Sequence, residues 1–193
     1  MNNASYNIVN YWNDRKEPNS INTVTNTDLI NKQVDFFSSY LEGGMNVLDV
    51  GPGVGRLAKS YTGVNLTVFD ISEIYKDKLL KEYKKYNINV KNIDIKKEDW
   101  ATLPYKTNQF DVVTSALVLL HQPPETIKNT MSEILRVGKK FICLTTEIKT
   151  SAPHVFNHNY KKIVESFNLV YNEIEFTDIG QIYFTINSEE YEN

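Results

Sequence analysis

Apolar residues along this chain follow two spacings, one typical of strands and one typical of helices. Segments of the two kinds alternate from about residue 45 onward. Five short apolar runs rich in β-branched residues have the length and flanking residues of buried strands. These predicted strands are residues 45–50, 65–70, 89–95, 110–115 and 139–146. Apolar residues at helical spacing lie between them, most clearly over 72–86 and 124–137. Strand and helix in alternation predict a parallel sheet with helices on both faces.

The two ends of the chain depart from this alternation. Helical spacing predicts a short helix over residues 6–14 and a second helix over 27–41. Near the other end, two apolar runs at 169–177 and 181–187 are separated by three residues, and so short a turn requires antiparallel pairing. We therefore predict an α/β fold with a doubly wound, mostly parallel, seven-stranded sheet, N-terminal helices and an antiparallel C-terminal hairpin.

Composition narrows the classes of protein that fit. No repeat or linker divides the chain, so we predict one domain over residues 1–193, with 1–43 as a helical cap or lid and 44–193 as the α/β core. A formal net charge of −3 gives no strong field for nucleic acid, and no DNA partner is expected. With one cysteine, no signal peptide and no run of ~18 apolar residues, we expect a cytoplasmic protein without a membrane partner.

The stretch "NVLDVGPGVGRLA" (46–58) carries the clearest chemical signal. Glycines at 51, 53 and 55 follow a predicted strand, where backbone amides can approach a ligand closely. We expect a helix directly after this loop, whose N-terminus would add a positive dipole. A nicotinamide-binding loop needs a third glycine where Arg56 stands, which argues against an oxidoreductase.

Asp70 closes the second predicted strand, 19 residues after Gly51. An acidic residue at this distance can hold a ribose, because one carboxylate accepts hydrogen bonds from both hydroxyls of a cis-diol. The alternative is that Asp70 caps the next helix, although Ser72 is also available for that role.

Three stretches together resemble the successive motifs of class I S-adenosylmethionine-dependent methyltransferases. They are "VLDVGPGVGRLA" (47–58), "TVFDIS" (67–72) and the segment from "EDWATLPY" to "CLTTE" (98–147). The resemblance runs from Met45 to the C-terminus, because the closing antiparallel strand pair is also typical of this family. It implies S-adenosyl-L-methionine as cofactor and in-line methyl transfer to oxygen or nitrogen of a small-molecule or glycan acceptor.

The resemblance also assigns cofactor-binding residues. The first motif wraps the methionine and ribose part of the cofactor in this family, and the matching residues are Asp49, Gly51, Pro52, Gly53 and Gly55. Asp70 matches the acidic residue that holds the ribose hydroxyls, and Ile71 would lie against the adenine.

Later motifs supply the rest of this predicted site. Asp99, followed by Trp100, matches the residue that accepts a hydrogen bond from the adenine amino group, and Asp94 is a rival for that role. Ser115 and Leu117 follow the fourth strand, where family members contact the methionyl portion.

The segment before the first strand often folds over the cofactor in methyltransferases of this size. Tyr11 and Trp12 would then supply aromatic cover, and Arg15 would pair with the cofactor's carboxylate. The alternative is that Trp12 packs on the domain and Arg15 is solvated.

Three histidines are candidates for the acceptor side. His121 lies just after the fourth strand and could take a proton from a hydroxyl acceptor, or could only shape the pocket. His154, His158 and Tyr160 are predicted to contact the acceptor, with loop capping as the alternative. The two later histidines have the spacing of a metal pair, but no third ligand is evident nearby beyond Glu147, so no metal is expected.

Other functions stay open at this point. The acceptor could be a protein or an RNA, although no basic stripe favours RNA. The domain could also bind S-adenosylmethionine without turnover, as a scaffold.

Overall fold

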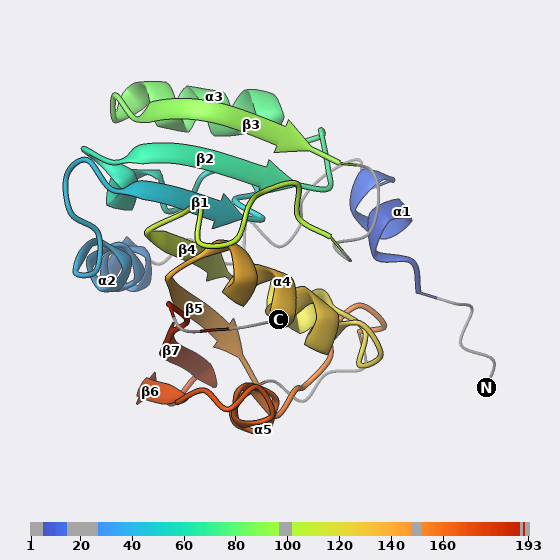
Figure 1. The fold of residues 1–193 in the computed structure, drawn as a ribbon. Helices are drawn as coiled ribbons and strands as arrows, with labels where there is room; N and C mark the ends of the chain where they lie inside the picture. The colour runs from blue at the N-terminus through green and yellow to red at the C-terminus, as the bar shows by residue number, and fades with distance from the viewer. Residues whose placement is uncertain (1–5, 15–26, 97–101, 148–151, 190, 192–193) are drawn as a thin grey trace. The chain divides into compact units, whose positions relative to one another are not determined.

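The computed structural model describes residues 6–14, 27–96, 102–147, 152–189 and 191 (Figure 1). Its elements, in chain order, are α1 (Ile8–Asn13), α2 (Thr27–Ser38), β1 (Asn46–Val50), η1 (Ala58–Tyr61), β2 (Asn65–Asp70), α3 (Lys76–Lys85), β3 (Asn89–Ile95), β4 (Val112–Ala116), η2 (Leu119–His121), α4 (Ile127–Val137), β5 (Lys140–Thr146), α5 (Tyr160–Glu165), β6 (Asn172–Phe176) and β7 (Gln181–Asn187). The seven strands form one mixed sheet in the order β3-β2-β1-β4-β5-β7-β6. The predicted fold class and its antiparallel C-terminal hairpin are therefore confirmed.

The chain divides into two compact units. One comprises Val9–Glu98 and is called here the glycine-loop unit, which contains β1 to β3. The other comprises Met1–Ile8 with Asp99–Asn193 and is called the hairpin unit, which contains β4 to β7. A single domain with residues 1–43 as a cap stays a prediction.

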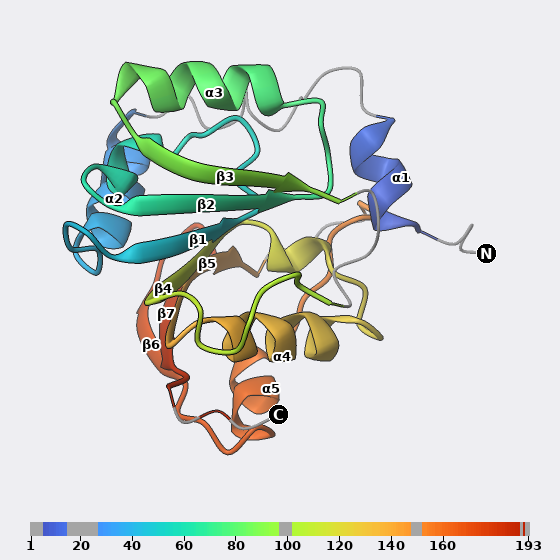
Figure 2. The same ribbon diagram turned by 45° about the horizontal axis from the view of Figure 1, so that its top comes forward.

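Three parallel strands form the centre of the glycine-loop unit. β1 pairs with β2, and β2 pairs with β3, so that the three strands lie side by side with α3 running along them (Figures 1 and 2). Val47, Leu48 and Val50 are completely buried, as expected for a strand covered on both faces. The helices α2 and α3 each contact η1, so these three elements belong to the same layer.

The full helix expected directly after the glycine loop is absent, and this expectation was wrong. Only the four residues of η1 are helical between β1 and β2, in 3-10 geometry. β1 ends at Val50 and β2 begins at Asn65, which leaves 14 residues for the loop and the return to the sheet. A typical helix alone takes about 11 residues. No helix dipole therefore supports ligand binding at this loop.

The hairpin unit is built around β5 and β7. β5 pairs in parallel with β4 and antiparallel with β7, and β7 pairs antiparallel with β6. α4 buries the apolar face predicted from its spacing, formed by Ile127, Met131, Ile134 and Leu135. Cys143 lies in β5 and is completely buried, and burial raises the pKa of its thiol well above the ordinary value. It therefore serves as a small core residue.

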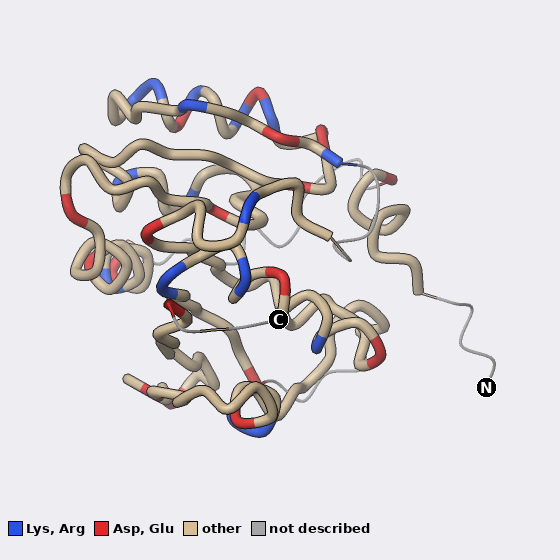
Figure 3. Tube along the Cα trace, in the orientation of Figure 1, with Lys and Arg blue, Asp and Glu red and all other residues tan. Residues whose placement is uncertain are grey.

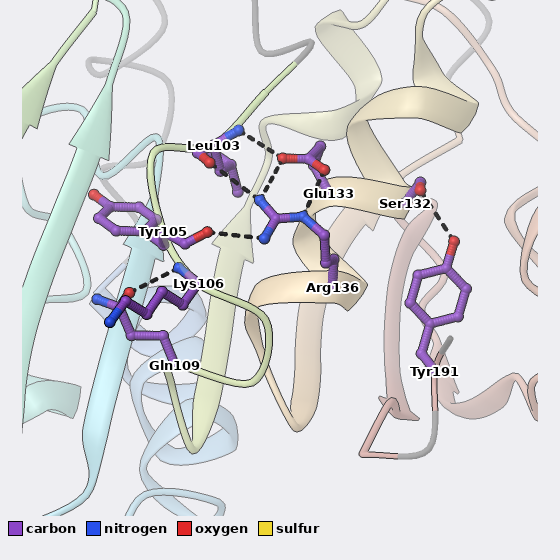
Figure 4. A network of polar contacts seen from close by, with 8 residues as sticks. All are labelled: Leu103, Tyr105, Lys106, Gln109, Ser132, Glu133, Arg136 and Tyr191. Atoms are coloured by element: carbon purple, nitrogen blue, oxygen red, sulfur yellow. Dashed lines mark hydrogen bonds and ion pairs between the residues drawn. The ribbon is translucent and has the colours of Figure 1, made fainter. Parts of the chain in front are cut away.

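An ion pair on α4 fastens the segment that precedes β4 (Figure 4). Glu133 accepts two hydrogen bonds from Arg136, each 2.7 Å long, and also accepts one from the backbone N–H of Leu103 at 2.7 Å. Arg136 in turn donates to the carbonyl oxygens of Leu103 at 3.1 Å and Tyr105 at 2.8 Å. The hydrogen bond from Arg136 lowers the pKa of Glu133. The α4 helix and the 103–105 segment are thereby joined.

Glu133→Gln is expected to lower the free energy of unfolding by about 2–3 kcal/mol, because the mostly buried Arg136 loses its charged partner. Glu165→Gln is a matched control, since the pair between Lys161 and Glu165 is long, at 3.9 Å, and exposed. The control is expected to cost less than about 0.5 kcal/mol. Urea unfolding measures both. Equal losses in the two variants would show that the α4 ion pair does not hold the segment.

Lysines and acidic residues are interleaved along α3 (Figure 3). Its exposed charged positions are lysines and Asp77. Only Leu79 and Tyr83 of this helix are buried. The lysine-rich stretch is thus the solvated face of an amphipathic helix. Within the described ranges, no helix is both long and apolar enough to cross a membrane.

Candidate functional site

Two carboxylates share one face of the sheet in the glycine-loop unit. Asp49 lies beside Val68 in the pairing of β1 with β2, and Asp70 follows Val68 by two residues. Side chains two apart on a strand, and side chains directly beside each other on neighbouring strands, point to the same face. Asp49 is 4% exposed and Asp70 is half-buried. The carboxyl ends of β1 and β2 therefore present a buried acidic face.

Asp70 ties the glycine loop to the end of β2. Its Oδ1 accepts a hydrogen bond from the N–H of Ser72 at 3.0 Å, and its Oδ2 accepts a long one from the N–H of Gly53 at 3.4 Å. Burial raises the pKa of Asp70 to about 6, although backbone N–H groups offset part of the rise. The next helix begins only at Lys76, so Asp70 is not its cap. The carboxylate instead reaches the predicted cofactor loop.

The three loop glycines have left-handed backbones, which favour glycine, but their surroundings differ. A Cβ on Gly53, at φ +56°, would meet no described atom within 4 Å. A Cβ on Gly55, at φ +80°, would lie 3.0 Å from Leu79 Cδ1 and 3.2 Å from Glu82 Cβ. α3 therefore packs directly against Gly55. The space beside Gly53 is open and can admit a ligand, which fits the cofactor predicted for this loop.

Alanine at these two glycines is expected to have separate effects. Gly55→Ala should lower the free energy of unfolding by about 2–4 kcal/mol, because backbone strain adds to a clash with α3. Gly53→Ala should cost only about 1 kcal/mol, because it meets strain alone. If a cofactor lies beside this loop, Gly53→Ala should still weaken its binding more than tenfold. Urea unfolding and ligand titration measure the two effects, and equal stability losses would contradict the packing of α3 on Gly55.

The N-terminal helix α1 lies against the residues that follow Asp70. Asn13 Nδ2 donates to the carbonyl oxygen of Ile71 at 2.9 Å, and Ser72 Oγ donates to that of Trp12 at 3.1 Å. Tyr11 meets the Trp12 ring edge-on, with ring centroids 5.2 Å apart. The helix that carries Tyr11 and Trp12 thus lies at the end of β2, where Ile71 is only 3% exposed. Aromatic cover of a cofactor by Tyr11 and Trp12 stays a prediction.

Of the two aspartates that could bind the adenine amino group, Asp94 and Asp99, the structure describes only Asp94. Asp94 pairs with Phe69 across β2 and β3, so it lies on the opposite face from Asp70. Its Oδ2 accepts a hydrogen bond from Asn92. Arg15, Asp99 and Trp100 lie outside the described residues.

Two of the predicted cofactor-binding residues, Ser115 and Leu117, lie on either side of the last residue of β4 in the hairpin unit. Ser115 is completely buried, and its Oγ has no hydrogen-bond partner among the described residues. Leu117 has a φ of +60°, which costs a residue with a side chain about 1–2 kcal/mol. Its N–H donates to the carbonyl oxygen of Leu144 at 2.7 Å. An orphaned hydroxyl and a strained residue at a strand end are typical of functional sites.

Three hydrogen bonds join the loop after β4 to the loop after β5. The N–H of Phe156 donates to the carbonyl oxygen of Leu120 at 2.8 Å. His121 Nδ1 lies 2.7 Å from the carbonyl oxygen of His154, and His158 Nε2 lies 2.9 Å from that of Gln122. All three histidines therefore lie on two loops that are hydrogen-bonded to each other. The sequence could not show this arrangement.

These bonds assign the imidazole tautomers, because a carbonyl oxygen only accepts. His121 carries its proton on Nδ1, which places its basic lone pair on Nε2. His158 carries its proton on Nε2 and is 6% exposed, and burial lowers its pKa. A neutral imidazole with its lone pair on Nε2 can accept a proton from a hydroxyl group.

Tyr160 lies deeper than expected for an acceptor-binding residue. It is 3% exposed, and its hydroxyl is 2.9 Å from Thr145 Oγ1 in β5. Burial raises the pKa of the phenol, so the hydroxyl stays protonated. These contacts favour a packing role for Tyr160.

Sequence reasoning missed two aromatic residues at the histidine loops and one beside the acidic face. Tyr6 donates from its hydroxyl to the carbonyl oxygen of His121 at 3.2 Å, and its ring lies 5.6 Å from that of Phe156. Tyr83 of α3 is 2% exposed, and burial together with Asp49 and Asp70 raises its pKa. Its spacing of four from Leu79 was the available signal. Among the described residues, no group of three His, Cys, Asp or Glu side chains is placed to hold a metal ion.

Comparisons with known proteins agree with this geometry. The family described as "Methyltransferase domain" matches residues 47–140. No curated protein matches the chain by sequence. Among solved structures, magnesium protoporphyrin IX methyltransferase from Synechocystis PCC 6803 with bound SAM has a TM-score of 0.68 and 16% identity, over 96% of this chain and 99% of that one.

Two further structures show how widely the fold is used. The PH0226 protein from Pyrococcus horikoshii OT3 has a TM-score of 0.63 and 17% identity, over 92% of this chain and 95% of that one. The [4+2]-cyclase SpnF has a TM-score of 0.61 and 18% identity, over 77% of this chain and 59% of that one. The glycine loop, the strand order and the matching family model lead to one conclusion: residues 47–140 match a methyltransferase domain, and the chain has the fold of S-adenosylmethionine-dependent methyltransferases.

Proposed function

We propose that this enzyme transfers a methyl group from S-adenosylmethionine to a hydroxyl group of a small-molecule acceptor. The observation that carries the proposal is the glycine loop, where Asp70 accepts from the N–H of Gly53 and open space lies at the Gly53 Cα. A ligand there would meet backbone N–H groups and a carboxylate at the ends of β1 and β2, where ligands of open α/β sheets bind.

The residues that would hold the cofactor follow from their chemistry. Asp70 would accept hydrogen bonds from the two ribose hydroxyls, and Ile71 with α1 would cover the adenine side. Asp49 and the loop from Gly51 to Gly55 would contact the ribose and methionine part. Ser115, whose hydroxyl has no partner among the described residues, stays a prediction for the methionyl portion. Arg15 for the cofactor's carboxylate and Asp99 for the adenine amino group stay predictions.

His121 is the proposed base. When bound, the cofactor supplies a methyl group on a sulfonium, whose carbon–sulfur electron pair leaves with the sulfur. The protein must align the acceptor oxygen with this methyl group and remove the hydroxyl proton as the new bond forms. Nε2 of His121 accepts that proton, while Nδ1 stays bonded to the carbonyl oxygen of His154 and keeps the ring oriented.

The acceptor is the least constrained part of the proposal. The Synechocystis enzyme named above is, by its name, a methyltransferase of magnesium protoporphyrin IX, a small molecule. A glycan, protein or RNA acceptor would use the same cofactor site. The similarity to a [4+2]-cyclase keeps a second candidate in place, namely a domain that binds the cofactor without methyl transfer. A cytoplasmic location stays a prediction from the sequence.

Methyl transfer is tested by incubating the protein with S-adenosylmethionine and pools of hydroxylated aromatic compounds, sugars and amines. S-adenosylhomocysteine formation is measured by mass spectrometry, with Asp70→Ala as control for spontaneous decay. Acceptor-dependent S-adenosylhomocysteine with hydroxyl compounds supports the proposal. Transfer confined to amines would contradict the assignment of a hydroxyl acceptor and of His121 as its base.

A further inference from the structure

The helix α1 is too short to be stable by itself. It has six residues, from Ile8 to Asn13, whereas an isolated helix shorter than about 12–15 residues is marginal in water. Its stability must therefore come from contacts with other parts of the chain. Val9 to Asn13 belong to the glycine-loop unit, which also carries Asp70. Two hydrogen bonds join α1 to the residues directly after Asp70.

The first of these hydrogen bonds comes from the side chain of Asn13. Its Nδ2 carries two hydrogens, and it donates to the carbonyl oxygen of Val9 within the helix and to that of Ile71, both at 2.9 Å. Both donor hydrogens of the amide group are therefore engaged. One amide group thus ties the helix to the residue that follows Asp70.

The second hydrogen bond comes from Ser72. Its Oγ donates to the carbonyl oxygen of Trp12 at 3.1 Å, while its backbone N–H donates to Oδ1 of Asp70 at 3.0 Å. Oδ2 of the same carboxylate accepts the long hydrogen bond from the N–H of Gly53. An unbroken series of hydrogen bonds therefore runs from α1 through Ser72 and Asp70 to the glycine loop.

This series links the position of α1 to the orientation of the carboxylate. Ser72 and Gly53 each hold one oxygen of Asp70, so a shift of Ser72 would turn the carboxylate. The two hydrogen bonds to α1 oppose such a shift. A ligand bound to Asp70 would in turn hold Ser72 and stabilise α1, because coupling between two sites is reciprocal.

We propose that Asn13 and Ser72 are positioning residues, which couple the docking of α1 to the orientation of the Asp70 carboxylate. The consequence is tighter cofactor binding when α1 is docked. The proposal rests on the proposed function, because Asp70 is the ribose-binding group there. Asn13 and Ser72 act on the cofactor through Asp70 and need not touch it.

Ser72→Ala removes the hydrogen bond to α1 but keeps the backbone N–H that binds Asp70. Ser60→Ala is the matched control, since Ser60 is also buried in this unit and its Oγ donates to the carbonyl oxygen of Val34 at 3.2 Å. Urea unfolding should show similar stability losses in the two variants. Calorimetric titration should show S-adenosylhomocysteine binding weakened about three- to tenfold by Ser72→Ala and less than about twofold by Ser60→Ala. Equal affinities in the two variants would overturn the proposal.

Asn13→Ala removes the link from the other side. Asn10→Ala is its control, because Asn10 is exposed on the same helix and the change of residue is identical. Alanine favours a helix more than asparagine does, so a loss of affinity cannot come from helix propensity. S-adenosylhomocysteine binding should weaken about three- to tenfold in Asn13→Ala and less than about twofold in Asn10→Ala. The same affinity in both variants would contradict a positioning role for Asn13.

Hydrogen exchange followed by NMR tests the coupling without any ligand. Asn13→Ala should speed exchange of the Ser72 backbone N–H at least about threefold in the unliganded chain, and Asn10→Ala should leave it unchanged. An unchanged rate in Asn13→Ala would overturn the coupling.

The two measurements separate this inference from the proposed function. If wild type binds S-adenosylhomocysteine but neither its affinity nor the exchange at Ser72 responds to Asn13→Ala, the coupling fails and the cofactor site stands. If exchange at Ser72 responds as expected but wild type does not bind S-adenosylhomocysteine, the coupling stands and the proposed function fails.

Discussion

Asp70→Asn is expected to weaken S-adenosylhomocysteine binding about 100-fold, which is about 2.7 kcal/mol, without lowering the stability of the unliganded protein at pH 7.5. The carboxylate reaches the glycine loop through Gly53, and in its ionised form it accepts hydrogen bonds from both ribose hydroxyls. Asparagine keeps one acceptor and replaces the other by a donor that opposes the N–H of Gly53. Calorimetric titration of wild type and variant measures the loss.

The stability of this variant follows from the pKa of Asp70. The folded-state pKa of about 6 lies above the ordinary pKa of an aspartate, 3.8, so the native state holds the proton over a range in which the unfolded chain has lost it. The free energy of unfolding therefore falls as the pH rises from about 4 to 6, by up to about 3 kcal/mol. Asparagine removes this loss, and the urea midpoint at pH 7.5 should equal or exceed that of wild type.

Binding should depend on pH in the opposite sense. Because the ionised carboxylate binds the ribose, wild-type affinity should fall below pH 6, by up to tenfold per pH unit. Asp70→Asn should show no such dependence. Asp94→Asn is the matched control, since Asp94 lies on the other face of the sheet. A hundredfold loss in the Asp94 variant, with Asp70→Asn unaffected, would reverse the assignment of the ribose-binding carboxylate.

His121→Asn is expected to lower kcat on a hydroxyl acceptor about 100-fold or more, while KM changes less than threefold. The asparagine amide can still donate to the carbonyl oxygen of His154, so the joined loops keep their hydrogen bond. What is lost is the lone pair on Nε2. Steady-state kinetics with an acceptor from the transfer screen measures the split between kcat and KM.

The same variant decides between the two roles that the sequence left open for His121. A base should give a kcat that rises with pH in wild type and loses this dependence in His121→Asn. A residue that only shapes the pocket should raise KM, with kcat reduced less than tenfold and its pH profile unchanged. The second outcome would remove His121 from the proton-transfer step but leave the cofactor site intact.

The layout of strands could be predicted because their signals are local. A buried run rich in β-branched residues, such as 47–50, predicts a strand independently of the segments around it. The three-residue turn before Gln181 permits only antiparallel pairing. Asp70 could be placed at a strand end for the same reason. Its contact with Gly53 followed from the parallel pairing of β1 and β2, which brings their carboxyl ends together.

What could not be predicted depends on contacts between distant segments. The helix expected after Gly55 is shortened to η1, because Asn65 already begins the next strand and Leu79 of α3 packs against the loop. The hydrogen bond between His121 and His154 joins residues 33 apart, and no local pattern marks it. The Glu133–Arg136 pair has helical spacing, but its backbone partners lie in another segment.

The central claim is that the glycine loop binds S-adenosylmethionine, and calorimetric titration of the wild-type chain with S-adenosylhomocysteine tests it most directly. NADH serves as the control ligand, because the two cofactors share an adenosine but differ in the part that the loop contacts. Saturable binding of S-adenosylhomocysteine, with NADH binding at least 100-fold weaker, is the predicted result. Folded protein that binds NADH as well as S-adenosylhomocysteine, or binds neither, would contradict the claim.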